Sequence, residues 1–218
     1  MTAKTNFYTY LGILISYTTI SLVNWLFKTY NGEMLSNSQA FSKELIILGM
    51  VGVLFLVIRY GEKQGLDSIG LYRSFFGRSI LRALLLAILS VAGIAVALLL
   101  CQQLGWSFGE SHTFDELSLW TITLIVIRAG VAEEVFMRGF LLERLSTITG
   151  SKWVAAALSL IPFALLHYPG QGWAGVLVSF AAGAILTWFY FWKRDLKANI
   201  MAHFLVDFIP NVAAQWFV

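Results

Sequence analysis

The sequence predicts an all-α protein whose helices cross a lipid bilayer several times. Of its 218 residues, 58% are hydrophobic and only 12% are charged, whereas soluble domains carry about 25% charged residues. The mean hydropathy is +0.75, and several windows approach or exceed the ~20 apolar residues that a helix needs to span the hydrocarbon region. We therefore expect residues 1–218 to form a single integral membrane domain, a polytopic bundle of helices.

About seven hydrophobic segments are expected to span the membrane, and six or eight remain compatible with the pattern. The first segment is longer than the core of a signal peptide, and no small-residue cleavage site follows it, so we expect it to be retained. The second is short and can extend into the amphipathic stretch around Met34, Leu35 and Phe41. In chain order the predicted spans are 7–27, 44–58, 79–101, 117–138, 151–167, 173–193 and 198–217.

The distribution of basic residues predicts that the N-terminus lies inside the cell. Twelve of the 15 lysine and arginine residues then fall in cytoplasmic segments, at Lys4 and within 59–82, 138–152 and 193–197. Two fall in outer segments and Arg128 lies within a span. Such an excess is typical of cytoplasmic loops. It explains the net charge without a nucleic-acid partner, and we expect a multi-pass protein of the cell (plasma) membrane whose partner is the lipid bilayer.

Three charged residues lie close together in the fourth predicted span. Glu133, Glu134 and Arg138 would each cost about 3 kcal/mol at the bilayer centre, so they are expected to face protein or a wet cavity. Residues i and i+4 share a face of a helix, so Glu134 and Arg138 can pair. Glu133 is rotated by about 100° from Glu134, and we expect it to remain free to react. The competing interpretation is an ion pair that only locks two helices together.

Two histidines and one further acid lie in the later predicted spans. His167 ends the fifth span, and His203 and Asp207 are spaced i, i+4 on the last one, which places them on one face. Asp207 could simply orient the His203 ring. The apolar runs of the first three predicted spans contain no acid. We therefore expect the later polar residues to converge on one site, although each of them singly could be structural.

Two carboxylates and two imidazoles in apolar surroundings suit two kinds of chemistry. A carboxylate and a histidine can polarise a water molecule for hydrolysis while a second pair stabilises the developing oxyanion. Alternatively, two histidines, a carboxylate and water form a catalytic zinc site. The common helical zinc motif His-Glu-x-x-His is absent. The residues by themselves leave both chemistries open.

The order and spacing of these motifs resemble those of the CPBP family of intramembrane proteases. This family includes type II CAAX prenyl endopeptidases and bacteriocin-processing or abortive-infection-type proteins. The resemblance covers about residues 117–210 and lies in Glu133-Glu134…Arg138, Phe163…His167 and His203…Asp207. It implies an all-helical catalytic core with a cavity open toward the cytoplasm. It also implies a peptide or protein substrate, including a lipid-modified or membrane-embedded one, that is cut near the cytoplasmic leaflet.

The same resemblance implies a role for each site residue. The implied roles are activation of water by Glu133 and His167, stabilisation of the oxyanion by His203 with Asp207, and shaping of the site by Glu134 with Arg138. By this resemblance, the prenyl-protease branch of the family carries an Asn at the position that corresponds to Asp207. An ionised aspartate cannot donate to an oxyanion, so Asp207 would be protonated or would only orient His203. A zinc mechanism with Glu133, His167 and His203 as ligands and a metal-free mechanism are both proposed for the family, and we favour the metal-free one.

The depth of His167 in the membrane is difficult to reconcile with a shared site. At 1.5 Å rise per residue, Glu133 and His203 lie ~8–9 Å from the predicted inner face, but His167 lies ~22 Å from it. We therefore expect the fifth span to start below the bilayer or to tilt strongly, or the turn 168–172 to fold inward. A His167 ring more than about 10 Å from Glu133 would contradict joint activation of one water molecule.

Two other functions are compatible with the same polar residues. A non-catalytic immunity or scaffold protein would keep the fold and use the cluster only for structure. A small proton-coupled transporter would use the glutamates and histidines as a proton relay, a common role of ionisable residues inside membranes.

Overall fold

The computed structural model describes residues 5–32, 34–73, 75–108, 114 and 117–216, and within them the chain is helical with no β-strand. The all-α prediction is confirmed. The first half contains α1 (Phe7–Asn31), α2 (Asn37–Leu56), η1 (Val57–Gly61), η2 (Leu66–Ile69) and α3 (Phe76–Gln103). The second half contains α4 (Leu119–Arg128), η3 (Ala129–Leu141), α5 (Leu142–Thr149), α6 (Lys152–Leu165), α7 (Tyr168–Lys193), α8 (Leu196–Asn211) and η4 (Ala213–Trp216).

Four helical segments of the described chain are long and apolar enough to cross a membrane by themselves, namely 7–31, 37–61, 76–103 and 168–193. The polytopic membrane character is therefore confirmed. The sequence predicts a short second segment, and the structure shows a longer one. Ser36 caps α2 through a reciprocal capping box with Gln39, so the helix starts at Asn37. The remaining helices do not have both properties. The helices α6 and α8 are short, and the continuous helical rod formed by α4, η3 and α5 contains charged residues.

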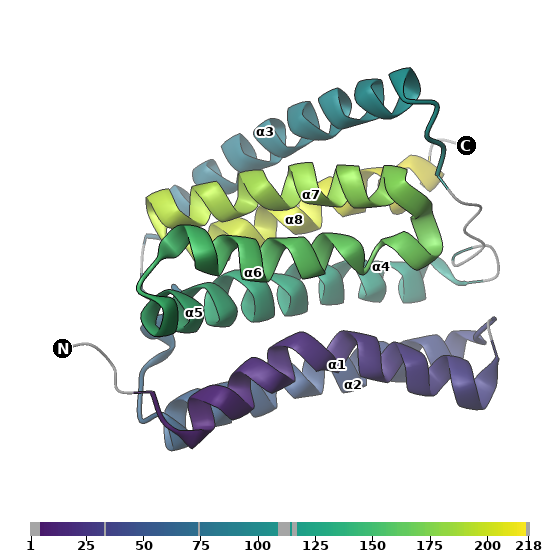
Figure 1. Cartoon of the computed structure of the whole chain (residues 1–218). Helices are drawn as coiled ribbons and strands as arrows, with labels where there is room; N and C mark the ends of the chain where they lie inside the picture. The colour runs from purple at the N-terminus through teal and green to yellow at the C-terminus, as the bar shows by residue number, and fades with distance from the viewer. Residues whose placement is uncertain (1–4, 33, 74, 109–113, 115–116, 217–218) are drawn as a thin grey trace.

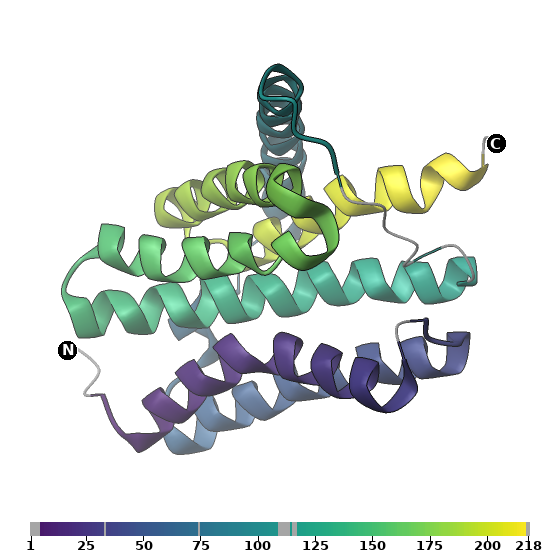
Figure 2. The same cartoon turned by 45° about the vertical axis from the view of Figure 1, so that its right-hand side comes forward.

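The α4–η3–α5 rod forms the centre of the bundle (Figures 1 and 2). The α1–α2 hairpin lies on one side of this rod, and α6, α7, α8 and α3 lie on the other. Eleven of the 13 residues of η3 are buried, so a charge on this segment meets protein rather than lipid. The rod is therefore the element that can hold Glu133 and Glu134 inside the membrane.

One end of the bundle collects the start of α1, the α5–α6 turn and the α7–α8 turn (left in Figure 1). Arg144 of α5, Lys152 and Arg194 lie in or next to these segments. These three of the basic residues that the sequence assigns to the cytoplasm are thus near one end of the bundle. The inside orientation of that end stays a prediction.

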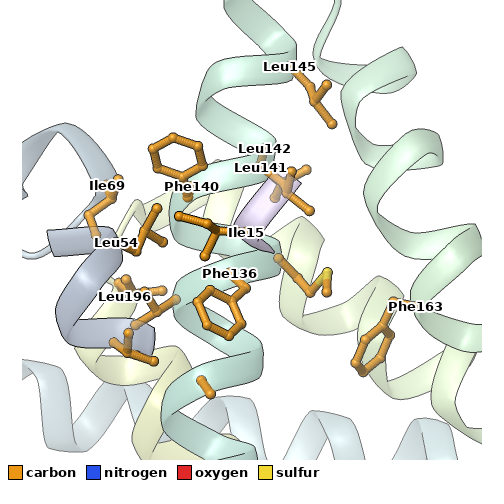
Figure 3. Close-up of a cluster of buried hydrophobic side chains, with 14 of the residues drawn as sticks. Ile15, Leu54, Ile69, Phe136, Phe140, Leu141, Leu142, Leu145, Phe163 and Leu196 are labelled. Carbon is orange, nitrogen blue, oxygen red and sulfur yellow. The ribbon is translucent and has the colours of Figure 1, made fainter. Parts of the chain in front are cut away.

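The hairpin and the rod are joined by an apolar core. Phe136 and Phe140 of η3 pack with Ile15 of α1 and Leu54 of α2, and these side chains are fully or almost fully buried (Figure 3). On the outer surface of α3, large apolar side chains such as Leu81, Ile88 and Leu99 remain exposed. Lipid tails are apolar, so such a surface suits a helix that faces the bilayer.

Gly12 of α1 permits the closest approach of the hairpin to the rod. A Cβ at Gly12 would lie 2.3 Å from Cζ of Phe140, and the buried Phe140 ring has no space into which to move. We expect Gly12→Ala to lower the free energy of unfolding by about 1–3 kcal/mol through overpacking. Unfolding in detergent micelles measures the effect. Gly49→Ala is the control, because its added Cβ meets nothing within 4 Å, and equal destabilisation by both variants would contradict the packing argument.

Candidate active site

The charged cluster lies on a widened helical turn. The segment Ala129–Leu141 is a π-helix, and the N–H of Leu142 accordingly donates to the carbonyl of Met137, an i→i+5 bond in place of the usual i→i+4 bond. π-turns inside α-helices occur frequently at functional sites. The wider turn brings Arg128 and Glu133, five residues apart, within an ion-pair distance of 2.9 Å.

Glu134 is the fully buried centre of a polar network. Its Oε1 accepts a hydrogen bond from Nη1 of Arg138 at 2.7 Å and lies 2.8 Å from Nδ1 of His203. Its Oε2 accepts from Nδ2 of Asn199 at 3.2 Å. The predicted pairing of Glu134 with Arg138 is confirmed. Asn199 is absent from the predicted site residues, although its i−4 spacing from His203 is a signal that could have identified it.

Arg138 extends this network to two further helices. Its Nη2 donates to the carbonyl oxygen of Gly183 in α7 at 3.4 Å, and its guanidinium lies 4.8 Å from the ring centroid of Phe163 in α6. A Cβ at Gly183 would lie 2.6 Å from Cδ1 of Leu160 and 2.8 Å from Nη2 of Arg138, so a side chain there would displace one or both of these groups. The Glu134–Arg138 pair thus joins η3, α6, α7 and α8, which is the geometry expected of residues that shape a site.

His203 lies between two carboxylates. Its Nδ1 contacts Glu134, and its Nε2 lies 3.4 Å from Oδ2 of Asp207, which confirms that His203 and Asp207 share a face of α8. A carboxylate only accepts hydrogen bonds, so both contacts are hydrogen bonds only when both ring nitrogens carry protons. The shorter contact to Glu134 fixes the ring. The longer contact to Asp207, whose side chain is 35% exposed, leaves the Nε2–H as the group that can turn toward a substrate oxygen.

Close approach of α8 to η3 makes this contact possible. A Cβ at Gly130 would lie 3.2 Å from the carbonyl oxygen of Ile200 and 3.2 Å from the backbone nitrogen of Phe204. Gly130 lies four residues before Glu134, and Phe204 directly follows His203. The absence of a side chain at Gly130 therefore allows α8 to place His203 against Glu134.

Glu133 is not the free carboxylate that the sequence predicts. Its Oε1 accepts from Nη1 of Arg128 at 2.9 Å, and Nε of Arg128 donates to Oε2 of Glu44 in α2. Nζ of Lys43 lies 3.1 Å from the other oxygen of Glu44. The prediction failed because the π-turn and the packing of α2 on α4 bring a partner that i, i+4 spacing does not reveal. The side chain of Glu133 keeps 13% of its surface exposed, whereas Glu134 is fully buried.

Glu44 also corrects the expectation that the first three spans contain no acid. Because α2 begins at Asn37, Glu44 lies in its second turn, and its side chain is fully buried. Arg128 and Glu44 are thus two polar residues that sequence reasoning missed. A lone arginine inside an apolar run was the available signal for Arg128. Nothing local indicated its contact with Glu44, which lies 84 residues away.

His167 lies between the end of α6 and the start of α7. Its Nδ1 lies 3.1 Å from the carbonyl oxygen of Phe163, and a carbonyl oxygen only accepts, so the tautomer that suits this contact is the one in which Nδ1 donates and Nε2 of the neutral ring is the acceptor. Gly172 breaks the helical path of α7 with φ +64°, and the expected lowered or tilted fifth span, or inward turn at 168–172, stays a prediction. In the described part of the chain His167 is hydrogen-bonded neither to Glu133 nor to His203. Their joint action on a water molecule stays a prediction.

The predicted zinc ligands do not form a metal site in this arrangement. Among the described residues, no group of three His, Cys, Asp or Glu side chains could hold a metal ion. Arg128 pairs with Glu133, and Nδ1 of His203 faces Glu134. The geometry of the described residues therefore does not fit a centre built from Glu133, His167 and His203.

A comparison with known families agrees with the motif spacing. Residues 115–209 match the family model described as type II CAAX prenyl endopeptidase Rce1-like. The matched segment contains every predicted site residue and runs from the start of the α4–η3–α5 rod into α8. It does not include α1, α2 or α3. No curated protein and no solved structure matches the chain.

Proposed function

Residues 115–209 of this chain match the model of the Rce1-like type II CAAX prenyl endopeptidases, and from this premise we propose that the protein is an intramembrane endopeptidase. It hydrolyses a peptide bond near the cytoplasmic leaflet of the cell membrane, in a lipid-modified or membrane-embedded substrate. The observation that carries the proposal is the difference in exposure between adjacent glutamates. Each is paired with an arginine, but Glu134 is fully buried against Arg138, whereas the side chain of Glu133 beside Arg128 remains 13% exposed.

In the proposed reaction, water attacks the carbonyl carbon of the scissile peptide bond. Glu133 accepts a proton from the water molecule, and the lone pair on Nε2 of His167 orients that water. The new C–O bond forms as the carbonyl π electrons move onto oxygen. When the tetrahedral intermediate collapses, the C–N bond breaks, and Glu133 returns the proton to the leaving amine.

His203 is the proposed donor to the oxyanion. Its Nε2–H exchanges the 3.4 Å contact with Asp207 for a shorter bond to the negatively charged oxygen, while Nδ1 stays on Glu134. Donors aimed at a developing oxyanion are among the largest contributions to catalysis. Asp207 then has an orienting role, because an ionised carboxylate cannot donate to the oxyanion itself.

The full-length protein in liposomes should cleave a farnesylated CAAX peptide faster than the same peptide without its prenyl group. The reason is that a lipid anchor holds the scissile bond at membrane depth and raises its local concentration. Mass spectrometry of the products gives the rate and the cut position. Absence of cleavage in every substrate tested, a transmembrane peptide included, would contradict the proposal. Cleavage that persists in chelator would argue against an exchangeable essential metal.

A further inference from the structure

A buried charge network connects Glu133 to the α1–α2 hairpin. Arg128 uses two different nitrogens of its guanidinium, Nη1 for Glu133 and Nε for Glu44. The side chain of Glu44 is fully buried, and Arg128 is also buried. Lys43 lies beside Glu44, so two cations and two anions balance along this network. The carboxylate of Glu133 is therefore one member of a network whose four charges sum to zero, and it is held from the hairpin side through Arg128.

The rod carries a second buried arginine, which pairs away from the site with the segment that follows the hairpin and η1. Nε and Nη2 of Arg144 in α5 donate to Glu62, and Nη2 also donates to Ser68 at 2.9 Å. The Arg144–Glu62 distance is 2.8 Å. This pair resembles Arg128–Glu44 in chemistry and burial, yet it contacts none of the site residues. The difference between the two pairs is the bond from Arg128 to Glu133.

We propose that Arg128 is a positioning residue for Glu133, and that Glu44 completes the site from outside the family-matched segment. The inference rests on the proposed function, in which Glu133 is the base. A carboxylate with two freely rotating bonds beyond its Cβ needs a fixed partner to present one oxygen to water. Arg128 supplies that partner because its planar guanidinium spans two carboxylates at once.

Glu44 also has a consequence for the charge balance during turnover. When Glu133 accepts a proton from water, Arg128 loses one of its two anions. An unpaired buried cation is strongly unfavourable, and Glu44 keeps Arg128 paired at that moment. The Glu133 carboxylate can thus become neutral for one step and return to its place without a change in the position of Arg128.

Arg128→Lys, Glu44→Gln and Arg144→Lys test this assignment in the full-length protein. Lysine keeps the charge at position 128 but offers a point charge in place of the two-sided guanidinium. We expect Arg128→Lys and Glu44→Gln to lower kcat about 10–100-fold, the cost of a small misplacement of a reacting group, with KM unchanged. Arg144→Lys, the matched control, should keep kcat per folded molecule. Unchanged kcat in Arg128→Lys, or an equal loss in Arg144→Lys, would overturn the proposal.

A readout without substrate separates this inference from the protease proposal. A hydrophobic carbodiimide modifies membrane carboxyl groups, and mass spectrometry locates the label. Release of Glu133 from its partner in Arg128→Met should increase labelling at Glu133 several-fold, whereas Arg144→Met should not. If the wild-type protein cleaves no peptide but this labelling pattern appears, the positioning role stands and the proposed function fails. Equal labelling of Glu133 in the wild-type protein and in Arg128→Met would overturn the positioning role.

Discussion

Glu133→Gln is expected to lower peptide hydrolysis by about 10²–10⁴-fold, the usual contribution of a positioned general base. Glutamine preserves the size of the side chain and can still accept a hydrogen bond from Arg128 through its amide oxygen. It cannot take a proton from water. The fold should persist, because Glu134, Arg138 and His203 keep their contacts. The measurement is kcat on a lipidated peptide in liposomes, together with the unfolding transition of each protein.

Glu143→Gln is the matched control for this substitution. Glu143 lies on the same rod and accepts from Tyr190 at 2.8 Å and from Arg194 at 2.6 Å, away from the site. The control should retain wild-type kcat. The same pair of variants separates the alternative functions, because a scaffold or immunity protein would keep its protective effect in Glu133→Gln, and a proton-coupled carrier would lose transport. Wild-type hydrolysis by Glu133→Gln would remove Glu133 from the mechanism.

Helical periodicity predicted the parts of the site that lie within one helix. The pairs Glu134–Arg138 and His203–Asp207 are spaced i, i+4, and both occur in the structure. Hydropathy likewise predicted the four helices of the described chain that can span a membrane by themselves, because such a span must be long and apolar whatever its partners are. These features depend on local sequence, so a single chain contains enough information for them.

Contacts between different helices could not be predicted from the local sequence pattern. The Arg128–Glu44 pair joins α4 with α2, and its existence depends on how two helices pack rather than on any local spacing. The Arg128–Glu133 pair escaped for a different reason, because an ordinary α-helix does not place residues five apart on one side. Only the π-turn of η3 does so. The depth argument, that ~22 Å of straight helix is too long for a shared site, predicted a lowered or tilted fifth span or an inward turn, and it stays a prediction beside the kink at Gly172.

The adjacent carboxylates should differ in the effect of their removal, because Glu134 balances a buried cation. In Glu134→Gln, the guanidinium of Arg138 would lose its carboxylate partner, and among the described residues it would keep only neutral ones, namely the new amide oxygen, the Gly183 carbonyl and the Phe163 ring. We expect the free energy of unfolding to fall by about 3–5 kcal/mol, the cost of leaving a buried charge unpaired. Arg138→Met should destabilise by a similar amount, because Glu134 would then retain only His203 and Asn199.

The double variant Glu134→Gln/Arg138→Met distinguishes a paired charge from two independent contacts. Removing both charges together leaves no uncompensated ion, so its loss of stability should be much smaller than the sum of the single losses. Unfolding in mixed micelles of increasing denaturing-detergent content gives the three values. The exposed Glu143–Arg194 pair, treated in the same way, should give a coupling of less than about 1 kcal/mol. Strictly additive losses at Glu134 and Arg138 would contradict this account. Recovery of hydrolysis in the double variant would show that this pair supports the site without taking part in the chemistry.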